Sequence, residues 1–364
     1  MVTRGYERDF AERCFSQIEG FGEYGFPESH AASFALLVYA SAWLKRHHPA
    51  VFACALLNSQ PMGFYAPAQI VRDAREHGVE VRPVCANASY WDCTLEPGTN
   101  GSLALRLGFR QVKGLREEDG QWISAARGNG YPDIEALWRR AGLSRAAITR
   151  LANADAFAPS GLGRREALWE ARALTGGAPL PLFPDGEGLT EPPVRLPAPS
   201  LGEQVIEDYR SLRLSLRAHP LALLRESLGS GHTAARIADT PDGARIAATG
   251  LVITRQRPGT ASGVIFITLE DETGVVNVIV WSKVYERFRR AVIAGRLLRV
   301  TGRLQREGSV SHLIAWRIED LSPVLDRLGL PPGTASAAKQ PAPPPGARHP
   351  RDQARQLFPS RDFH

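Results

Sequence analysis

The basic side chains of residues 245–320 have the chemistry needed to hold a nucleic-acid backbone. This stretch contains 12 Lys and Arg against 7 Asp and Glu, so its net charge of +5 nearly equals the +6 of all 364 residues. Forty of the chain's 44 basic residues are arginine, whose planar guanidinium can donate two parallel hydrogen bonds to one phosphate. A GC-rich genome would produce the same bias, so composition alone leaves both explanations open.

Six side chains in this stretch are candidates for binding a single strand. Four of them lie near expected strand ends and loops and are candidates for phosphate contact, with a solvated surface as the alternative: Arg255, Arg257, Arg303 and Arg306. Phe266 and Trp281 are candidate platforms for base stacking, which contributes ~1–3 kcal/mol per base in proteins that bind single strands. Strand alternation favours the alternative that both rings pack inside a barrel core.

A second candidate contact lies in residues 108–126, which have the pattern of a helix–hairpin–helix. A short element leads into the hairpin Val112-Lys113-Gly114-Leu115, and an amphipathic helix follows. Glycine would let the hairpin backbone approach a phosphate, and the N–H groups at the next helix start would point at that anion. A second helical pair is expected across residues 143–174, although an ordinary helical connector is the alternative. The residues expected to contact the DNA backbone are Lys113, Gly114 and Arg116.

We expect no catalytic residue and no metal site in this chain. The GxGxxG of residues 20–25 follows a helical pattern and precedes Pro27, so it predicts a loop rather than a dinucleotide site. Glu270-Asp271-Glu272 lies between two strand patterns and predicts a turn. The sequence contains no Asp-x-Asp, and its histidines have no partner at metal-ligand spacing. A carboxylate pair for two-metal nucleotidyl transfer is therefore not evident.

The periodicity of residues 245–320 predicts the elements that must position these side chains. Apolar and polar residues alternate in five segments, with one helical pattern between the third and the fourth. The predicted strands are 246–255, 263–269, 275–281, 297–304 and 310–318, and the predicted helix is 283–292. This is the order of an OB-fold, a Greek-key barrel whose face binds single-stranded nucleic acid.

The N-terminal part of the chain has a helical pattern. Helices are predicted over residues 28–46, 51–59 and 66–77. The first of these is apolar on nearly every face, which is typical of a helix inside a larger body.

Several classes of protein are excluded. No stretch reaches the ~18–20 apolar residues that a membrane helix needs, and the N-terminus lacks the basic-then-apolar pattern of a signal peptide. The four cysteines contain no CxxC pair, which argues against a disulfide scaffold or an all-cysteine zinc site. We therefore expect a cytoplasmic protein with no membrane partner.

Several motifs together carry a family resemblance. Within residues 18–65, the stretch Phe26-Pro27-Glu28-Ser29-His30-Ala31-Ala32-Ser33-Phe34 has the form of a polymerase fingers signature. Residues 78–96 and 360–364 are typical of the same branch, and LEDETG at residues 269–274 is typical of its OB-folds and of some tRNA-synthetase anticodon domains. The chain resembles the C-terminal third of a bacterial C-family, alpha-subunit type DNA polymerase, in the error-prone branch used in damage-induced mutagenesis.

The resemblance implies a multidomain α+β chain. A helical remnant of the fingers and a tandem helix–hairpin–helix unit would be followed by an all-β OB-fold barrel. The implied segments are the end of the fingers (1–100), the tandem helix–hairpin–helix unit (101–175), a Pro/Gly-rich linker (176–202), a helical connector (203–240), the OB-fold domain (241–325) and a disordered tail (326–364).

The resemblance also implies a DNA-directed DNA polymerase by family. In such proteins the PHP domain, the palm and most of the fingers, with the catalytic aspartates, lie upstream of the matched region. We therefore expect this chain alone to be inactive and to bind no cofactor, and Mg²⁺ to serve the intact enzyme. Ser29 and His30 match the fingers motif and are candidates for nucleotide or template contact, with helix capping by Ser29 as the alternative.

The expected partners are duplex DNA and single-stranded template, in DNA replication, repair and translesion synthesis. Gln356-Leu357-Phe358 weakly resembles peptides that bind a sliding clamp, and the resemblance suggests accessory mutagenesis proteins. Two alternatives stay open. One is a stand-alone DNA-binding module without sequence specificity or catalytic activity, against which the apolar residues 31–44 argue. The other is a fragment that does not fold.

Overall fold

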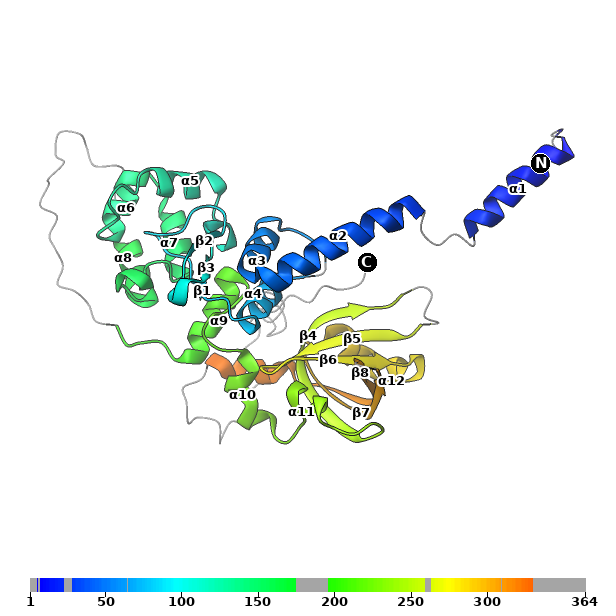
Figure 1. The fold of residues 1–364 in the computed structure, drawn as a ribbon. Coiled ribbons are helices and arrows are strands. Elements are labelled where there is room, and N and C mark those ends of the chain that lie inside the picture. Colours follow the sequence, from blue (N-terminus) through cyan, green and yellow to red (C-terminus); the bar gives the residue numbers. More distant parts are fainter. Residues whose placement is uncertain are drawn as a thin grey trace, which may run out of the picture.

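The structure is a computed structural model that describes Gly5 and residues 7–22, 28–63, 65–174, 196–258, 263–308 and 310–329. Helices dominate the first two thirds of the described chain, and a closed β-barrel follows (Figure 1). Helix α1 (Arg8–Gly22) and the beginning of α2 (Glu28–His47) extend away from the rest of the molecule (Figure 1).

The N-terminal helices follow the predicted pattern. Helix α3 (Pro49–Asn58) begins directly after α2, because proline lacks only an N–H that a first turn leaves unpaired. Helix α4 (Pro67–Glu76) begins in the same way. The three helices predicted between residues 28 and 77 are therefore confirmed, with ends that differ by one or two residues.

A small sheet and a group of short helices share one hydrophobic core. Strand β3 (Leu103–Arg106) pairs in parallel with β1 (Val81–Arg82) and antiparallel with β2 (Thr94–Pro97). The helices are α5 (Glu117–Ala125), α6 (Ile134–Ala141), α7 (Arg145–Asn153) and α8 (Arg164–Ala173). Their common core extends from Ala50 to Leu214. It therefore crosses the predicted domain boundary at residue 100, which lies between the paired strands β2 and β3, and it reaches the segment predicted to be a helical connector.

Three more helices lead from this body to the barrel. They are α9 (Leu201–Leu212), α10 (Pro220–Leu228) and the short α11 (Ala234–Ala238). The 3-10 helix η5 (Ser322–Gly329), which follows the barrel, returns to pack against α9 and α10.

The barrel confirms the predicted strand order. Its elements are β4 (Arg245–Gln256), β5 (Ile265–Glu270), β6 (Val275–Val280), α12 (Ser282–Ala294), β7 (Leu297–Glu307) and β8 (Val310–Asp320). The sheet closes in the order β4-β5-β6-β8-β7, with β4 and β7 paired. Alternate residues of each strand fill the inside, which is why a period of two in the sequence located these strands.

Charged residues join the barrel to the helical body. Arg72 of α4 donates to Glu270 at 2.8 Å and to the backbone carbonyl of Asp271 at 3.0 Å. Arg225 of α10 binds the carboxylate of Glu272, with Nε 2.7 Å from Oε1. Asp271 accepts the backbone N–H of Thr273 at 2.7 Å, and the chain turns there between β5 and β6. The prediction of a turn at this acidic cluster is confirmed.

His219 makes this junction sensitive to pH. It caps α10 by accepting the backbone N–H of Leu221 at 3.2 Å, which requires an unprotonated ring nitrogen. Burial lowers the pKa of His219 below its ordinary value of 6.5, against the opposing effect of Glu270. Below pH 6.5 the unfolded chain therefore binds a proton that the folded chain does not, so the free energy of unfolding falls as the pH is lowered.

We expect His219→Asn to flatten this part of the pH profile, since asparagine can cap the helix but does not titrate. The free energy of unfolding is measured with urea at several pH values. In the unmodified chain this one proton should lower it by at most about 1.4 kcal/mol for each pH unit below 6.5, and in the variant this contribution should be absent. Parallel curves for the two proteins would contradict the role given to His219.

Candidate nucleic-acid interface

The first hairpin of the expected DNA-binding unit lies between η3 (Phe109–Gln111) and α5. Gly114 has a φ of 79°, a left-handed conformation that glycine adopts without steric cost. A Cβ at Gly114 would lie 3.2 Å from Nε of Arg150, so the hairpin packs closely against α7. Lys113 is exposed, and its backbone N–H donates to the carbonyl of Ser211 at 2.8 Å. The hairpin backbone is thus fixed while the lysine ammonium faces solvent.

The beginning of α5 is acidic. Glu117, Glu118 and Asp119 form its first turn. The N-terminal end of a helix carries a partial positive charge, which favours carboxylates as it favours phosphates. The side chain of Arg116 is 68% exposed and lies 3.3 Å from the carboxylate of Asp119. A phosphate at this helix end must compete with these carboxylates. Lys113 is exposed and could attract it, whereas Arg116 would have to share its guanidinium between the phosphate and Asp119.

The second hairpin joins α7 to α8 and is tied to α9 by ion pairs. Asp155 lies in the turn with a φ of 59° and binds the guanidinium of Arg217. Asp208 of α9 is 1% exposed and accepts from Arg164 of α8 and from Arg217, the latter at 2.8 Å. These four side chains form one ion-paired network that ties the hairpin to α9.

Phe266 and Trp281 lie outside the barrel core. The core takes Ile265, Ile267 and Leu269 from β5, so the alternation of the strand turns Phe266 outward, where it is half-buried. Trp281 is 54% exposed and directly precedes α12. The alternative that both rings pack inside the core is wrong, and both stay candidates for base stacking.

The structure removes Arg255 from the set of candidate contacts. It is 2% exposed, and its Nε donates to the carbonyl of Val292 at 2.6 Å while a second nitrogen binds the carbonyl of Gly295. Its guanidinium therefore satisfies carbonyls at the end of α12 instead of facing solvent. Arg306 has a similar role, because its guanidinium donates to carbonyls after α11, including that of Thr240 at 3.1 Å.

Arg257 and Arg303 remain available on the barrel surface. Both are exposed. The guanidinium carbon of Arg257 lies 5.5 Å from the centre of the Tyr285 ring, which is a cation–π contact. Arg303 lies opposite Arg245 in the pairing of β7 with β4.

Two surface residues of the barrel were not among the sequence candidates. Trp316 on β8 is 42% exposed, and the guanidinium carbon of Arg245 lies 5.1 Å from the centre of its ring. The signal was present in the strand pattern, since Leu313 and Ala315 fill the core and the next residue must face outward. The pairing of Arg245 with Trp316 depends on the closure of the barrel, which no local pattern reveals.

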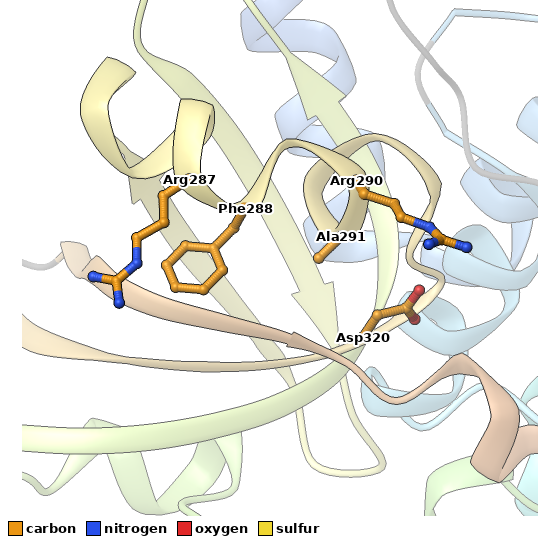
Figure 2. A pocket seen from close by; sticks show the side chains of 5 residues that line it. All are labelled: Arg287, Phe288, Arg290, Ala291 and Asp320. Carbon is orange, nitrogen blue, oxygen red and sulfur yellow. The ribbon is translucent and has the colours of Figure 1, made fainter.

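A pocket of about 380 Å³ lies between α12 and the end of β8. Figure 2 shows the side chains of Arg287 and Arg290 extending on opposite sides of Phe288 and Ala291, with the carboxylate of Asp320 on the Arg290 side. Asp320 accepts the backbone N–H of Ser322 at 3.0 Å, so part of its carboxylate is engaged in holding the chain after β8. The pocket combines an aromatic ring with charges of both signs.

Some candidates fall outside the structural description. Ser29 and His30 belong to the first turn of α2, but their side chains lie outside the described residues, as do residues 330–364 of the predicted tail, which include Gln356–Phe358. The role of each stays a prediction. The prediction that the disordered tail begins at residue 326 is wrong, because residues 326–329 belong to η5 and Leu328 is buried against α9 and α10. Among the side chains that the structure describes, no group of three His, Cys, Asp or Glu is placed to hold a metal ion. None of the described helices is long and apolar enough to cross a membrane.

Two family models match the two parts of this surface. Residues 78–167 match a helix-hairpin-helix motif, and residues 246–321 match an OB-fold nucleic acid binding domain. Among solved structures, asparaginyl-tRNA synthetase from Pyrococcus horikoshii is 24% identical where it overlaps, covering 25% of this chain and 23% of its own, with a TM-score of 0.22.

Curated relatives match between 90% and 100% of the chain. An error-prone DNA polymerase of Ruegeria pomeroyi is 64% identical across 100% of this chain and 34% of its own length. Error-prone DNA polymerases of Brucella abortus and Sinorhizobium medicae are each 52% identical, covering 100% and 90% of this chain and 34% and 32% of their own. By sequence, the chain belongs with the error-prone branch of the C-family DNA polymerases and spans about a third of the length of these relatives.

Proposed function

We propose that this chain is the DNA-binding portion of an error-prone DNA polymerase that acts in translesion synthesis and damage-induced mutagenesis. The observation that carries the proposal is the presence of a helix–hairpin–helix unit and an OB-fold barrel in a chain whose full length is 64% identical to a third of an error-prone DNA polymerase. Exposed basic side chains in both parts, Lys113 and Arg116 in the first and Arg257 and Arg303 in the second, support it.

In this proposal the two parts hold different forms of DNA. The hairpins hold the product duplex by its phosphates, and the barrel holds the single-stranded template. Contacts with phosphates position a protein on DNA without selecting a sequence, which suits an enzyme that must move along any template. Aromatic side chains outside the barrel add stacking, which is equally tolerant of sequence.

The bond-forming step is assigned to another part of the intact enzyme. The reaction would be template-directed transfer of a deoxynucleotide to a primer 3′ end, and Mg²⁺ would serve it there. The described residues offer no cluster of ligands for that ion, so they do not fit a two-metal site. Helix α2 supports a larger assembly, because Leu36, Leu37 and Tyr39 are 60–73% exposed on successive faces of the helix.

Several finer assignments belong to the same proposal. Ser29 and His30 would lie near the nucleotide or the template in the fingers. Gln356–Phe358 would bind a sliding clamp, accessory mutagenesis proteins would be further partners, and the enzyme would work in the cytoplasm.

The proposal is tested by the salt dependence of DNA binding. We expect the chain to bind single-stranded and duplex DNA with an affinity that falls as salt rises, with a log–log slope of about 0.7 per phosphate contacted on a single strand and about 0.9 on a duplex. Arg257→Ala and Arg303→Ala should each reduce the single-strand slope by about 0.7. Fluorescence anisotropy with labelled oligonucleotides measures both quantities.

Arg210→Ala is the matched control for these variants. Arg210 is an exposed arginine on α9 that is paired with Glu207, and its loss should leave the slope unchanged. An affinity that does not change with salt, or no DNA binding at all, would contradict the proposed function.

A further inference from the structure

The outer surface of the barrel carries one continuous row of side chains across all five strands. The strand register aligns the members of the row in the order Phe266, Ile279, Ile314, Arg303 and Arg245. Each of them alternates with a residue that fills the core, so all five face outward. With strands about 4.8 Å apart, the row runs for about 19 Å around the barrel.

The row has aromatic rings and arginines at both ends. At its first end, Phe266 pairs with Gln256, and the exposed Arg257 comes next along the chain. At its other end, Arg303 and Arg245 lie side by side, and the guanidinium of Arg245 lies 5.1 Å from the ring of Trp316.

The two middle positions of the row, and the outward neighbours of Arg303 on β7, carry no charge that would repel phosphate. Ile279 and Ile314 are half-buried, and the outward neighbours of Arg303 on the same strand, Thr301 and Gln305, are uncharged.

A β-bulge places Trp316 on this surface. Gly302 of β7 pairs with Ala315 and Thr301 pairs with Arg317, so Trp316 has no residue opposite it. Trp316 and Arg317 consequently both face outward, and Arg317 is occupied by an ion pair with Glu319 at 2.6 Å. A large ring is thereby held at the surface beside two arginines.

We propose that this row is the path of one DNA strand around the barrel, and that Trp316 with Arg245 and Arg303 forms a second base-binding position beyond the face that carries Phe266. A base stacks on Trp316, and the flanking phosphates bind the two guanidinium groups. The inference rests on the proposed function, because it assumes that the barrel binds single-stranded DNA, and it adds where the strand runs. Single-stranded nucleic acid is the ligand that fits, because it alone offers flat rings and phosphates in alternation over ~4–16 nucleotides per OB-fold.

The test uses the full chain and a fluorescein-labelled oligo(dT) of about 20 nucleotides. Trp316→Ala should weaken binding by about 5- to 150-fold, the loss expected for one stacked base. Trp316→Phe should recover most of that loss, because phenylalanine keeps a ring on which a base can stack. Arg245→Ala should lower the salt slope by about 0.7. Trp169→Ala is the control, since Trp169 is 47% exposed on α8, away from the barrel.

The outcomes separate this inference from the proposed function. If the unmodified chain binds oligo(dT) and Trp316→Ala binds it equally well while Phe266→Ala weakens binding, the path over Trp316 is wrong and the proposed function stands. If Trp316→Phe binds as weakly as Trp316→Ala, with unchanged thermal unfolding in both, stacking at this position is refuted. If the unmodified chain binds no DNA, both proposals fail.

Discussion

Replacing Asp208 with alanine is expected to lower the free energy of unfolding of the helical body by about 3–5 kcal/mol. Asp208 is 1% exposed and is the shared partner of two arginines and a serine: Arg164, Arg217 and, at 2.7 Å, the hydroxyl of Ser215. Without the carboxylate, the guanidinium of Arg164 would stay buried with its main counter-charge removed. The cost of an unpaired buried charge is much larger than the net contribution of the pair itself.

The matched control for this substitution is one residue away. Glu207→Ala removes a carboxylate from the same helix, but its ion pair with Arg210 is exposed to solvent and should contribute less than about 1 kcal/mol. Urea unfolding followed by tryptophan fluorescence measures both variants. Equal destabilisation by the two substitutions would show that Asp208 is not the centre of the network.

Asp208→Ala should also weaken duplex binding while leaving single-strand binding in place. The network fixes the hairpin between α7 and α8 through Asp155 and Arg217, whereas the barrel has its own core. Loss of both activities together would mean that the two parts do not fold independently.

The barrel was the most predictable part of the fold. Strands that have one face in a core and one face in solvent repeat every two residues, and this pattern located all five strands, while a helical pattern between the third and the fourth located α12. The same rule could have placed both Phe266 and Trp316 on the outer surface of the barrel. The tandem hairpins were also predictable, since Gly114 adopts the left-handed φ that the hairpin pattern requires.

The exposure of individual arginines could not be predicted from local pattern. Arg255 lies on a strand that continues beneath the end of α12, where free carbonyls bind its guanidinium. The guanidinium of Arg306 likewise donates hydrogen bonds to backbone carbonyls where α11 ends. Arginine is often recruited to satisfy carbonyls at helix ends, and only the three-dimensional positions of those ends distinguish such arginines from those that face DNA.

Gly302→Ala is expected to destabilise the barrel by about 3 kcal/mol, the upper part of the usual cost of forcing extra volume into a closely packed site. A Cβ at Gly302 would lie 2.1 Å from the carbonyl oxygen of Ile314 on the paired strand, a distance that real Cβ atoms do not reach. Because the clash is with backbone, the strands β7 and β8 must move apart at the bulge. A rotamer change cannot relieve it.

Gly63→Ala is the control, because a Cβ at Gly63 would meet nothing within 4 Å, and its effect should stay within about 0.5 kcal/mol. The two variants are compared by urea unfolding and by oligo(dT) binding. Separating β7 from β8 would displace Trp316 and Arg303 together, so Gly302→Ala should reduce single-strand affinity more than Arg303→Ala does. A Gly302→Ala protein with unchanged stability would show that the bulge has room for a methyl group and that the close pairing of these strands is not what positions Trp316.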